Sequence, residues 1–152
     1  MANHSNSDDL FVLDTSALLT LHDDEPGAAE VEALLAEVGS QQKVWICFVS
    51  LMEFSYIVQQ KVGVEKARRS YAQLKQLPLM VVESGETLGL MAANIKAMHQ
   101  VSLADAWIAA TAQQLNATLM HKDPEFEELS QVVKLHSLPY KPKTSKKSLG
   151  LE

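Results

Sequence analysis

The sequence predicts an α/β domain in which a mainly parallel sheet is covered by helices on both faces. Short apolar runs alternate along the chain with longer amphipathic segments, the order expected of strands joined by helical crossovers. Helical crossovers of this length are right-handed and return the chain to a neighbouring parallel strand. The 152 residues fit a single domain, and we find no internal repeat or domain boundary among them.

Five short apolar runs are the candidate strands. They are rich in Val, Ile, Leu and Phe, and polar residues bound them, as is typical of strands. In chain order they cover residues 10–13, 43–48, 79–82, 118–120 and 132–135.

The candidate helices are amphipathic segments with helix-start signals. Pro26 lies near the first turn of the first segment, and a serine precedes three of the others. In chain order the helices are predicted over 27–38, 51–60, 64–77, 85–99, 103–116 and 125–130. In 85–99 the apolar side chains recur at helical spacing, at Leu88, Met91, Ala92, Ile95 and Met98.

The two ends of the chain differ in composition from the predicted domain, residues 10–140. Residues 1–9 are polar and acidic, so we predict disorder there and no secretion signal. Residues 141–152 are predicted to be a disordered basic tail, whose final Leu-Glu could be a cloning remnant. No run approaches the roughly 20 apolar residues of a membrane helix. The single cysteine, Cys47, lies in an apolar run, which favours a buried, reduced thiol in a cytoplasmic protein.

The charge is unevenly distributed, although the formal net charge is −6. Residues 1–40 contain nine acidic residues and no Lys or Arg. Residues 61–75 contain five basic residues and one acidic residue. Lys66, Arg68 and Arg69 in this stretch are candidates for guiding RNA, with a solvated helix face as the equally plausible alternative.

Four acidic residues are expected to meet at one edge of the sheet. Asp14 closes the first strand, and Glu53 opens the helix after the second. Asp105 opens the helix before the fourth strand, and Asp123 follows that strand. In a parallel α/β sheet, ligands bind outside the carboxyl ends of the strands. Clustered carboxylates repel one another, so they protonate or bind a hard cation such as Mg²⁺ or Mn²⁺.

Each of these acids also has a local structural interpretation. The pattern Ser-x-x-acid at 50–53 and at 102–105 matches a capping box. Asp14 could start an Asx turn, and Asp123 could cap the helix that begins at Pro124. Four caps that fall on the same edge of one sheet would, however, be a coincidence, which favours a common site.

Three segments of the sequence, FVLDTSALL, VSLADAWIAATA and HKDPEF, resemble the Asp-containing motifs of PIN-domain nucleases. Glu53 lies where that family has its Glu, and the resemblance extends over about residues 10–135. LADAWIAATA is the most specific match. The resemblance implies a three-layer α/β/α sandwich with a parallel sheet of about five strands, and Mg²⁺- or Mn²⁺-dependent endoribonuclease activity.

By the same resemblance, Asp14, Glu53, Asp105 and Asp123 would be catalytic and hold metal, and Ser16 would orient the Asp14 carboxylate. The small size of the chain resembles a VapC-type toxin. Such proteins are usually homodimers, inhibited by an antitoxin whose tail inserts into the active site. The chain departs from the family pattern two residues before its last Asp, where His121 replaces Thr or Ser. A histidine there could replace the hydrogen bond of that hydroxyl, or it could crowd a second metal position.

Other classes of site fit the sequence less well. The histidines and Cys47 lack zinc-ligand spacing, and no dinucleotide-binding or P-loop motif occurs. A haloacid-dehalogenase-type phosphatase would have Asp at position 16, where this chain has Ser16. Two hypotheses therefore remain, a metal-dependent endoribonuclease and a non-catalytic metal-binding module that acts by binding RNA or a partner.

Overall fold

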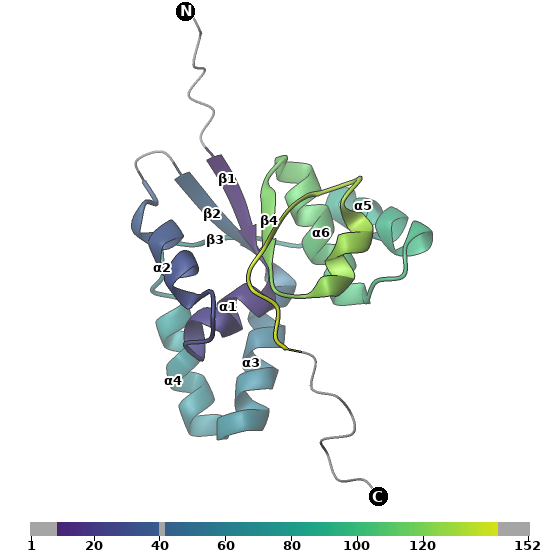
Figure 1. The fold of residues 1–152 in the computed structure, drawn as a ribbon. Helices are drawn as coiled ribbons and strands as arrows, with labels where there is room; N and C mark the ends of the chain where they lie inside the picture. The colour runs from purple at the N-terminus through teal and green to yellow at the C-terminus, as the bar shows by residue number, and fades with distance from the viewer. Residues whose placement is uncertain (1–8, 40–41, 143–152) are drawn as a thin grey trace, which may run out of the picture.

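Five parallel strands form one sheet in the order β3-β2-β1-β4-β5 (Figure 1). The structure is a computed structural model that describes residues 9–39 and 42–142. Val12 of the central strand is paired with Trp45 on one side and Leu119 on the other. The strands are β1 (Asp9–Leu13), β2 (Gln42–Cys47), β3 (Met80–Val82), β4 (Thr118–His121) and β5 (Lys134–Ser137).

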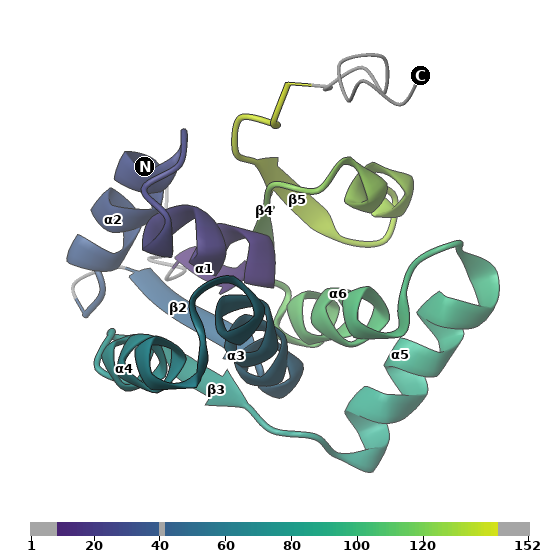
Figure 2. The same cartoon turned by 90° about the horizontal axis from the view of Figure 1, so that it is seen from below.

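Helices cover both faces of this sheet. Figure 2 shows α1, α2 and α4 on one side and α5 and α6 on the other, with α3 across the carboxyl end of the sheet. The helices are α1 (Thr15–His22), α2 (Ala28–Ala36), α3 (Phe48–Val62), α4 (Val64–Leu74), α5 (Glu86–Met98), α6 (Leu103–Leu115) and the 3₁₀ helix η1 (Pro124–Leu129). The predicted three-layer α/β/α fold is confirmed.

The core consists of two hydrophobic clusters, one on each face of the sheet. Successive residues of a strand point to opposite faces. Val12 accordingly packs in the cluster under α5 and α6, while its neighbour Leu13 packs in the cluster under α1 and α2. Leu119 and Met120 divide in the same way. Cys47 is buried in the first cluster, as predicted.

The bounds of several predicted elements differ by a few residues from the structure, as in α4, which ends at Leu74 rather than at 77. Three other differences bear on the site or on the core. Helix α1 was not predicted at all. Helix α3 begins at Phe48, so Ser50 lies inside it and the predicted capping box at 50–53 is wrong. Strand β5 covers Lys134–Ser137 rather than 132–135, because Val132 and Val133 occupy the turn after η1 and pack against the core.

The predicted disordered ends fall mainly on 1–8 and 143–152, outside the described residues. Asp9 is the first residue of β1, and Lys141 forms an ion pair with Glu25. Within the described ranges, none of the helices combines the length and the apolar character needed to cross a membrane.

Candidate metal centre

The strand order reverses between β1 and β4. After β1 the chain adds β2 and then β3 on one side, and it later adds β4 and β5 on the other. Such a switch point leaves a crevice outside the carboxyl ends of the two strands, the usual ligand position in open α/β sheets. Asp14 directly follows β1, and Asp123 lies two residues after β4. The backbone N–H of Asp14 donates to the carbonyl of Met120 at 2.9 Å, which holds the two strand ends together.

Asp14 is buried and held in one orientation by Ser16. The carboxylate caps helix α1, because its Oδ2 accepts hydrogen bonds from the Ser16 backbone N–H at 3.0 Å and from the Ser16 hydroxyl. The predicted Asx turn and the predicted role of Ser16 toward Asp14 are therefore both present. Burial raises the pKa of Asp14 from 3.8 to about 6; the Ser16 hydrogen bonds oppose this rise, and the charges of Glu53 and Asp123 add to it.

Glu53 reaches the same site from α3. The Thr15 hydroxyl donates to Glu53 Oε1 at 2.7 Å and lies 3.1 Å from the hydroxyl of the buried Ser50. Because Thr15 belongs to α1 and Ser50 to α3, these contacts join the two helices beside the carboxylates. Ser50 thus has a tertiary role, which the sequence pattern at 50–53 did not indicate.

Asp105 lies in the first turn of α6, where Ser102 is the N-cap. The backbone N–H of Asp105 donates to Ser102 Oγ at 3.1 Å, so the serine half of the predicted capping box at 102–105 is confirmed. Burial raises the pKa of the Asp105 carboxyl to about 7, and the charges of Asp14, Asp123 and Glu53 contribute to the rise. The charges of Glu53 and Asp123 therefore act on both Asp14 and Asp105 across the crevice.

Asp123 brings a further acid into the site. Its Oδ1 accepts the backbone N–H of Glu125 at 2.9 Å, which caps η1 as predicted. One carboxylate oxygen each of Asp105, Asp123 and Glu125 lie within 4.8 Å of one another. We did not predict Glu125 from the sequence. Its position two residues after Asp123, in the first turn behind Pro124, is the signal that could have identified it.

His121 is buried beside Asp123 and packs among aromatic side chains. Its Nδ1 accepts the backbone N–H of Asp123 at 3.2 Å, and burial lowers the pKa of the ring. The ring packs against Phe126 and Tyr140, with centroid distances of 5.2 and 6.1 Å. We predicted that His121 would either replace a hydrogen bond or crowd a metal position. The ring accepts a hydrogen bond from Asp123, and His121 is not a member of the group formed by Asp105, Asp123 and Glu125.

The donor set fits a hard divalent cation. All the side chains that converge are carboxylates, and oxygen ligands favour Mg²⁺ or Mn²⁺ over softer metals. Burial, together with the neighbouring negative charges, raises the pKa of Asp14 and of Asp105, so each carboxyl is costly to ionise without a counter-charge. A bound cation would remove that cost.

The predicted RNA-guiding residues lie apart from this cluster. Lys66, Arg68 and Arg69 are exposed on α4, which packs against α3. Arg68 lies 4.0 Å from Glu65, a loose contact between two exposed side chains. These cations are free to meet a polyanion, but the structure does not bring them to the carboxylates.

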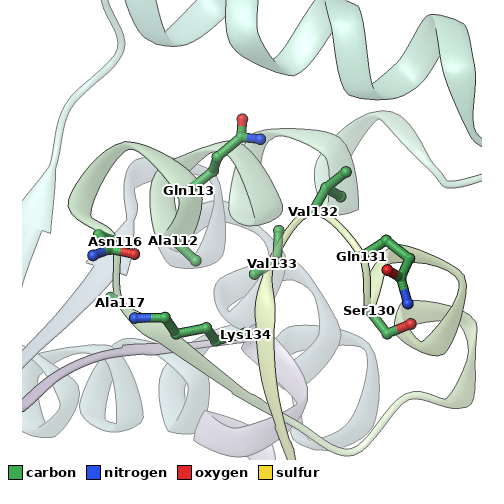
Figure 3. Close-up of a pocket in the computed structure, with 9 residues that line it drawn as sticks. All are labelled: Ala112, Gln113, Asn116, Ala117, Ser130, Gln131, Val132, Val133 and Lys134. Atoms are coloured by element: carbon green, nitrogen blue, oxygen red, sulfur yellow. The ribbon is translucent and has the colours of Figure 1, made fainter.

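A separate hollow of about 240 Å³ lies at the opposite end of the sheet, between the end of α6 and the start of β5 (Figure 3). Its lining contains no carboxylate. It is therefore not part of the candidate metal centre. The lining residues are Ala112, Gln113, Asn116, Ala117, Ser130, Gln131, Val132, Val133 and Lys134.

Comparison with known proteins gives the family. A family model described as PIN domain matches residues 11–132, most of the chain. The chain belongs to the PIN-domain family. No curated protein matches the sequence significantly.

Solved structures with the same fold include several VapBC complexes. VapBC2 from Rickettsia felis, bound to a promoter DNA fragment, is 15% identical, with 86% of this chain and 99% of that chain covered and a TM-score of 0.68. VapBC-1 from nontypeable Haemophilus influenzae is 19% identical, with 84% and 97% covered and a TM-score of 0.66. VapC20 of Mycobacterium tuberculosis, a sarcin–ricin loop cleaving toxin, is 16% identical, with 78% and 93% covered and a TM-score of 0.62. At these identities, the likeness establishes that this PIN domain shares their fold.

Proposed function

We propose that this PIN domain is an endoribonuclease that uses Mg²⁺ or Mn²⁺ to cut RNA phosphodiester bonds. The observation that supports this proposal most directly is the convergence of Asp14, Glu53, Asp105 and Asp123 from four separate segments of the chain. Burial raises the pKa of Asp14 and of Asp105, and the charges of the neighbouring acids add to both rises. A cluster that is costly to ionise when empty is suited to binding a cation. The family match over residues 11–132 supports nuclease chemistry at that cluster.

A bound divalent ion would neutralise phosphate charge and lower the pKa of an attacking water. The protein's part is to hold the ligands in place, because phosphoryl transfer depends mainly on positioning and charge neutralisation. Ser16 fixes the Asp14 carboxylate, and Thr15 fixes one oxygen of Glu53. Glu53 would then hold the metal, directly or through a water. Because this chemistry needs no nucleophilic side chain, the hydroxyls of Thr15 and Ser16 serve through their hydrogen bonds and not as nucleophiles.

We also propose that the enzyme is the toxin of a toxin–antitoxin pair in the cytoplasm, where Cys47 would stay reduced, and that it forms a homodimer. The support is the shared fold with the VapBC structures and the coverage of nearly the whole of each neighbouring chain. Lys66, Arg68 and Arg69 on α4 would guide RNA by contacts with its phosphates.

The test is cleavage of a structured RNA by the purified chain with Mg²⁺, with Mn²⁺ and with EDTA. Asp14→Asn and Asp105→Asn are compared with Glu32→Gln, which neutralises an exposed carboxylate on α2 outside the site. Circular dichroism checks that every variant is folded. We expect metal-dependent cleavage by the wild type and by the Glu32 variant, and none by the two Asp variants.

The other outcomes separate the competing hypotheses. Cleavage that persists in both folded Asp variants would refute the assigned site. Metal binding by a wild-type chain that cleaves no RNA, tested on transfer, ribosomal and messenger RNA after removal of any co-purified protein, would favour the non-catalytic binding module.

A further inference from the structure

Lys122 is a buried lysine beside the carboxylate cluster. Its side chain is only 4% exposed, whereas lysines are almost never buried unless they are paired. The Nζ atom donates to Glu25 Oε2 at 3.1 Å and to the carbonyl of Pro26 at 2.8 Å. The residue lies in the connection between β4 and η1, directly before Asp123.

The backbone of the same residue reaches Asp14. The N–H of Lys122 donates to Ser16 Oγ at 2.9 Å, and the Ser16 hydroxyl in turn donates to the Asp14 carboxylate. Lys122 therefore ties the connection that carries Asp123 to two segments near the start of the chain. These are the start of α1 and the connection between α1 and α2. The bonds join three segments in all. Two of these three segments hold a carboxylate of the site.

The partner of Lys122 is itself held from the outside. Lys141 Nζ lies 3.0 Å from Glu25 Oε1, so the two oxygens of Glu25 each have a lysine. Burial opposes ionisation of Glu25, but the hydrogen bonds from Lys141 and Lys122 hold its pKa below the ordinary value. Glu25 is thus a charged anchor, and it keeps one partner if Lys122 is replaced.

We propose that Lys122 is a positioning residue, which fixes the spacing between Asp14 and Asp123 by tying their segments to Glu25 and Pro26. This inference rests on the proposed metal centre. Partners that orient metal ligands commonly contribute 10- to 100-fold to metal affinity.

The test is Mn²⁺ affinity, measured by titration calorimetry on the full chain with Lys122→Met, an uncharged side chain of similar length. The matched control is Lys61→Met. Lys61, on α3, is paired at 3.0 Å with Asp23, which lies in the connection between α1 and α2, as Glu25 does. Within the described residues, no hydrogen bond or ion pair connects Lys61 to the four site carboxylates. We expect Lys122→Met to bind Mn²⁺ about 10-fold more weakly while it remains folded by circular dichroism. The control should bind like the wild type, and higher Mn²⁺ should restore RNA cleavage by Lys122→Met.

The other possible results would overturn either the role of Lys122 or the metal centre itself. Equal Mn²⁺ affinity of folded Lys122→Met and wild type would overturn the role of Lys122 alone. A wild-type chain that binds no Mn²⁺ would overturn the metal centre and this inference with it. If Lys122→Met does not fold, Glu25→Gln replaces it, since Pro26 still accepts from Lys122 and Lys141 is exposed. A several-fold loss of affinity in Glu25→Gln is then expected, and no loss would refute the proposal.

Discussion

Replacing Asp14 by asparagine is expected to stabilise the metal-free protein at neutral pH. The buried carboxyl has its pKa raised from 3.8 to about 6, and each pH unit between these values corresponds to about 1.4 kcal/mol. Ionisation of Asp14 therefore costs the folded state about 3 kcal/mol. Asparagine keeps an oxygen that can accept the hydrogen bonds of Ser16, but it carries no charge.

The sign of the pH dependence follows from the raised pKa. Below about pH 4 the carboxyl is protonated in both the folded and the unfolded chain, so its ionisation does not affect stability. Between about pH 4 and pH 6 only the unfolded chain ionises, and the wild type loses stability as the pH rises. Above pH 6 the loss is constant. The advantage of Asp14→Asn should therefore develop between pH 4 and pH 6 and remain constant at higher pH.

Urea and thermal unfolding in EDTA at several pH values measure this difference. For a chain of this size, about 3 kcal/mol corresponds to a rise in Tm of roughly 6–12 °C. Saturating Mn²⁺ should stabilise the wild type and leave Asp14→Asn nearly unchanged. Glu32→Gln serves as the control for removal of an exposed negative charge. A variant that is no more stable than the wild type at pH 8 in EDTA would refute the argument that ionisation of the buried Asp14 carboxyl is costly.

Three further predictions concern other parts of the molecule. Glu125→Gln should weaken Mn²⁺ affinity in titration calorimetry, because it removes one of three carboxylates within 4.8 Å of one another; unchanged affinity would exclude Glu125 as a ligand. Charge reversal of Arg68 and Arg69 should weaken RNA binding and reduce the slope of log affinity against log salt by about 0.7 for each phosphate that the variant no longer neutralises, as measured by fluorescence anisotropy. An unchanged slope would contradict RNA guidance by α4. Phe126→Ala should lower the free energy of unfolding by about 3–5 kcal/mol in urea, since the ring is fully buried against His121; a loss below about 1 kcal/mol would contradict that packing.

The three inner strands, β2, β1 and β4, were predictable because they contain buried residues on both faces of the sheet. Val12 and Leu13 pack on opposite sides of the sheet, so β1 is a continuous apolar run and stands out in the sequence. Strand β5 was displaced by two residues for a related reason. Val132 and Val133 are as apolar as strand residues, but they are buried in a turn rather than in the sheet.

Helix α1 was missed because it is short and follows β1 after a single residue. Its eight residues complete little more than two turns, too few for the helical period to be recognised. The helix is started by Asp14, which we interpreted as a turn or a metal ligand. The Asx turn at Asp14 is in fact the first turn of the helix, so the local and the functional interpretations of this residue describe one geometry.

The parts of the site that could not be predicted depend on tertiary contacts. A lysine is normally a surface residue, and the burial of Lys122 follows only from its pairing with Glu25, 97 residues earlier in the chain. Ser50 is similar, because its contact with Thr15 depends on how α1 and α3 pack. Asp14 and Asp105 were identifiable because local motifs contain them.

The two hydrophobic clusters have a consequence for the dynamics of the protein. Asp14 is carried by α1, which packs in one cluster, while Asp105 and Asp123 are carried by α6 and η1, which pack in the other. The carboxylates therefore span the boundary between the two clusters, and distinct packed units of a protein commonly open in separate events. A cation bound there would link the two layers into one cooperative unit. Amide hydrogen exchange should then slow on both faces of the sheet when Mn²⁺ is added, including in helices that contain no ligand.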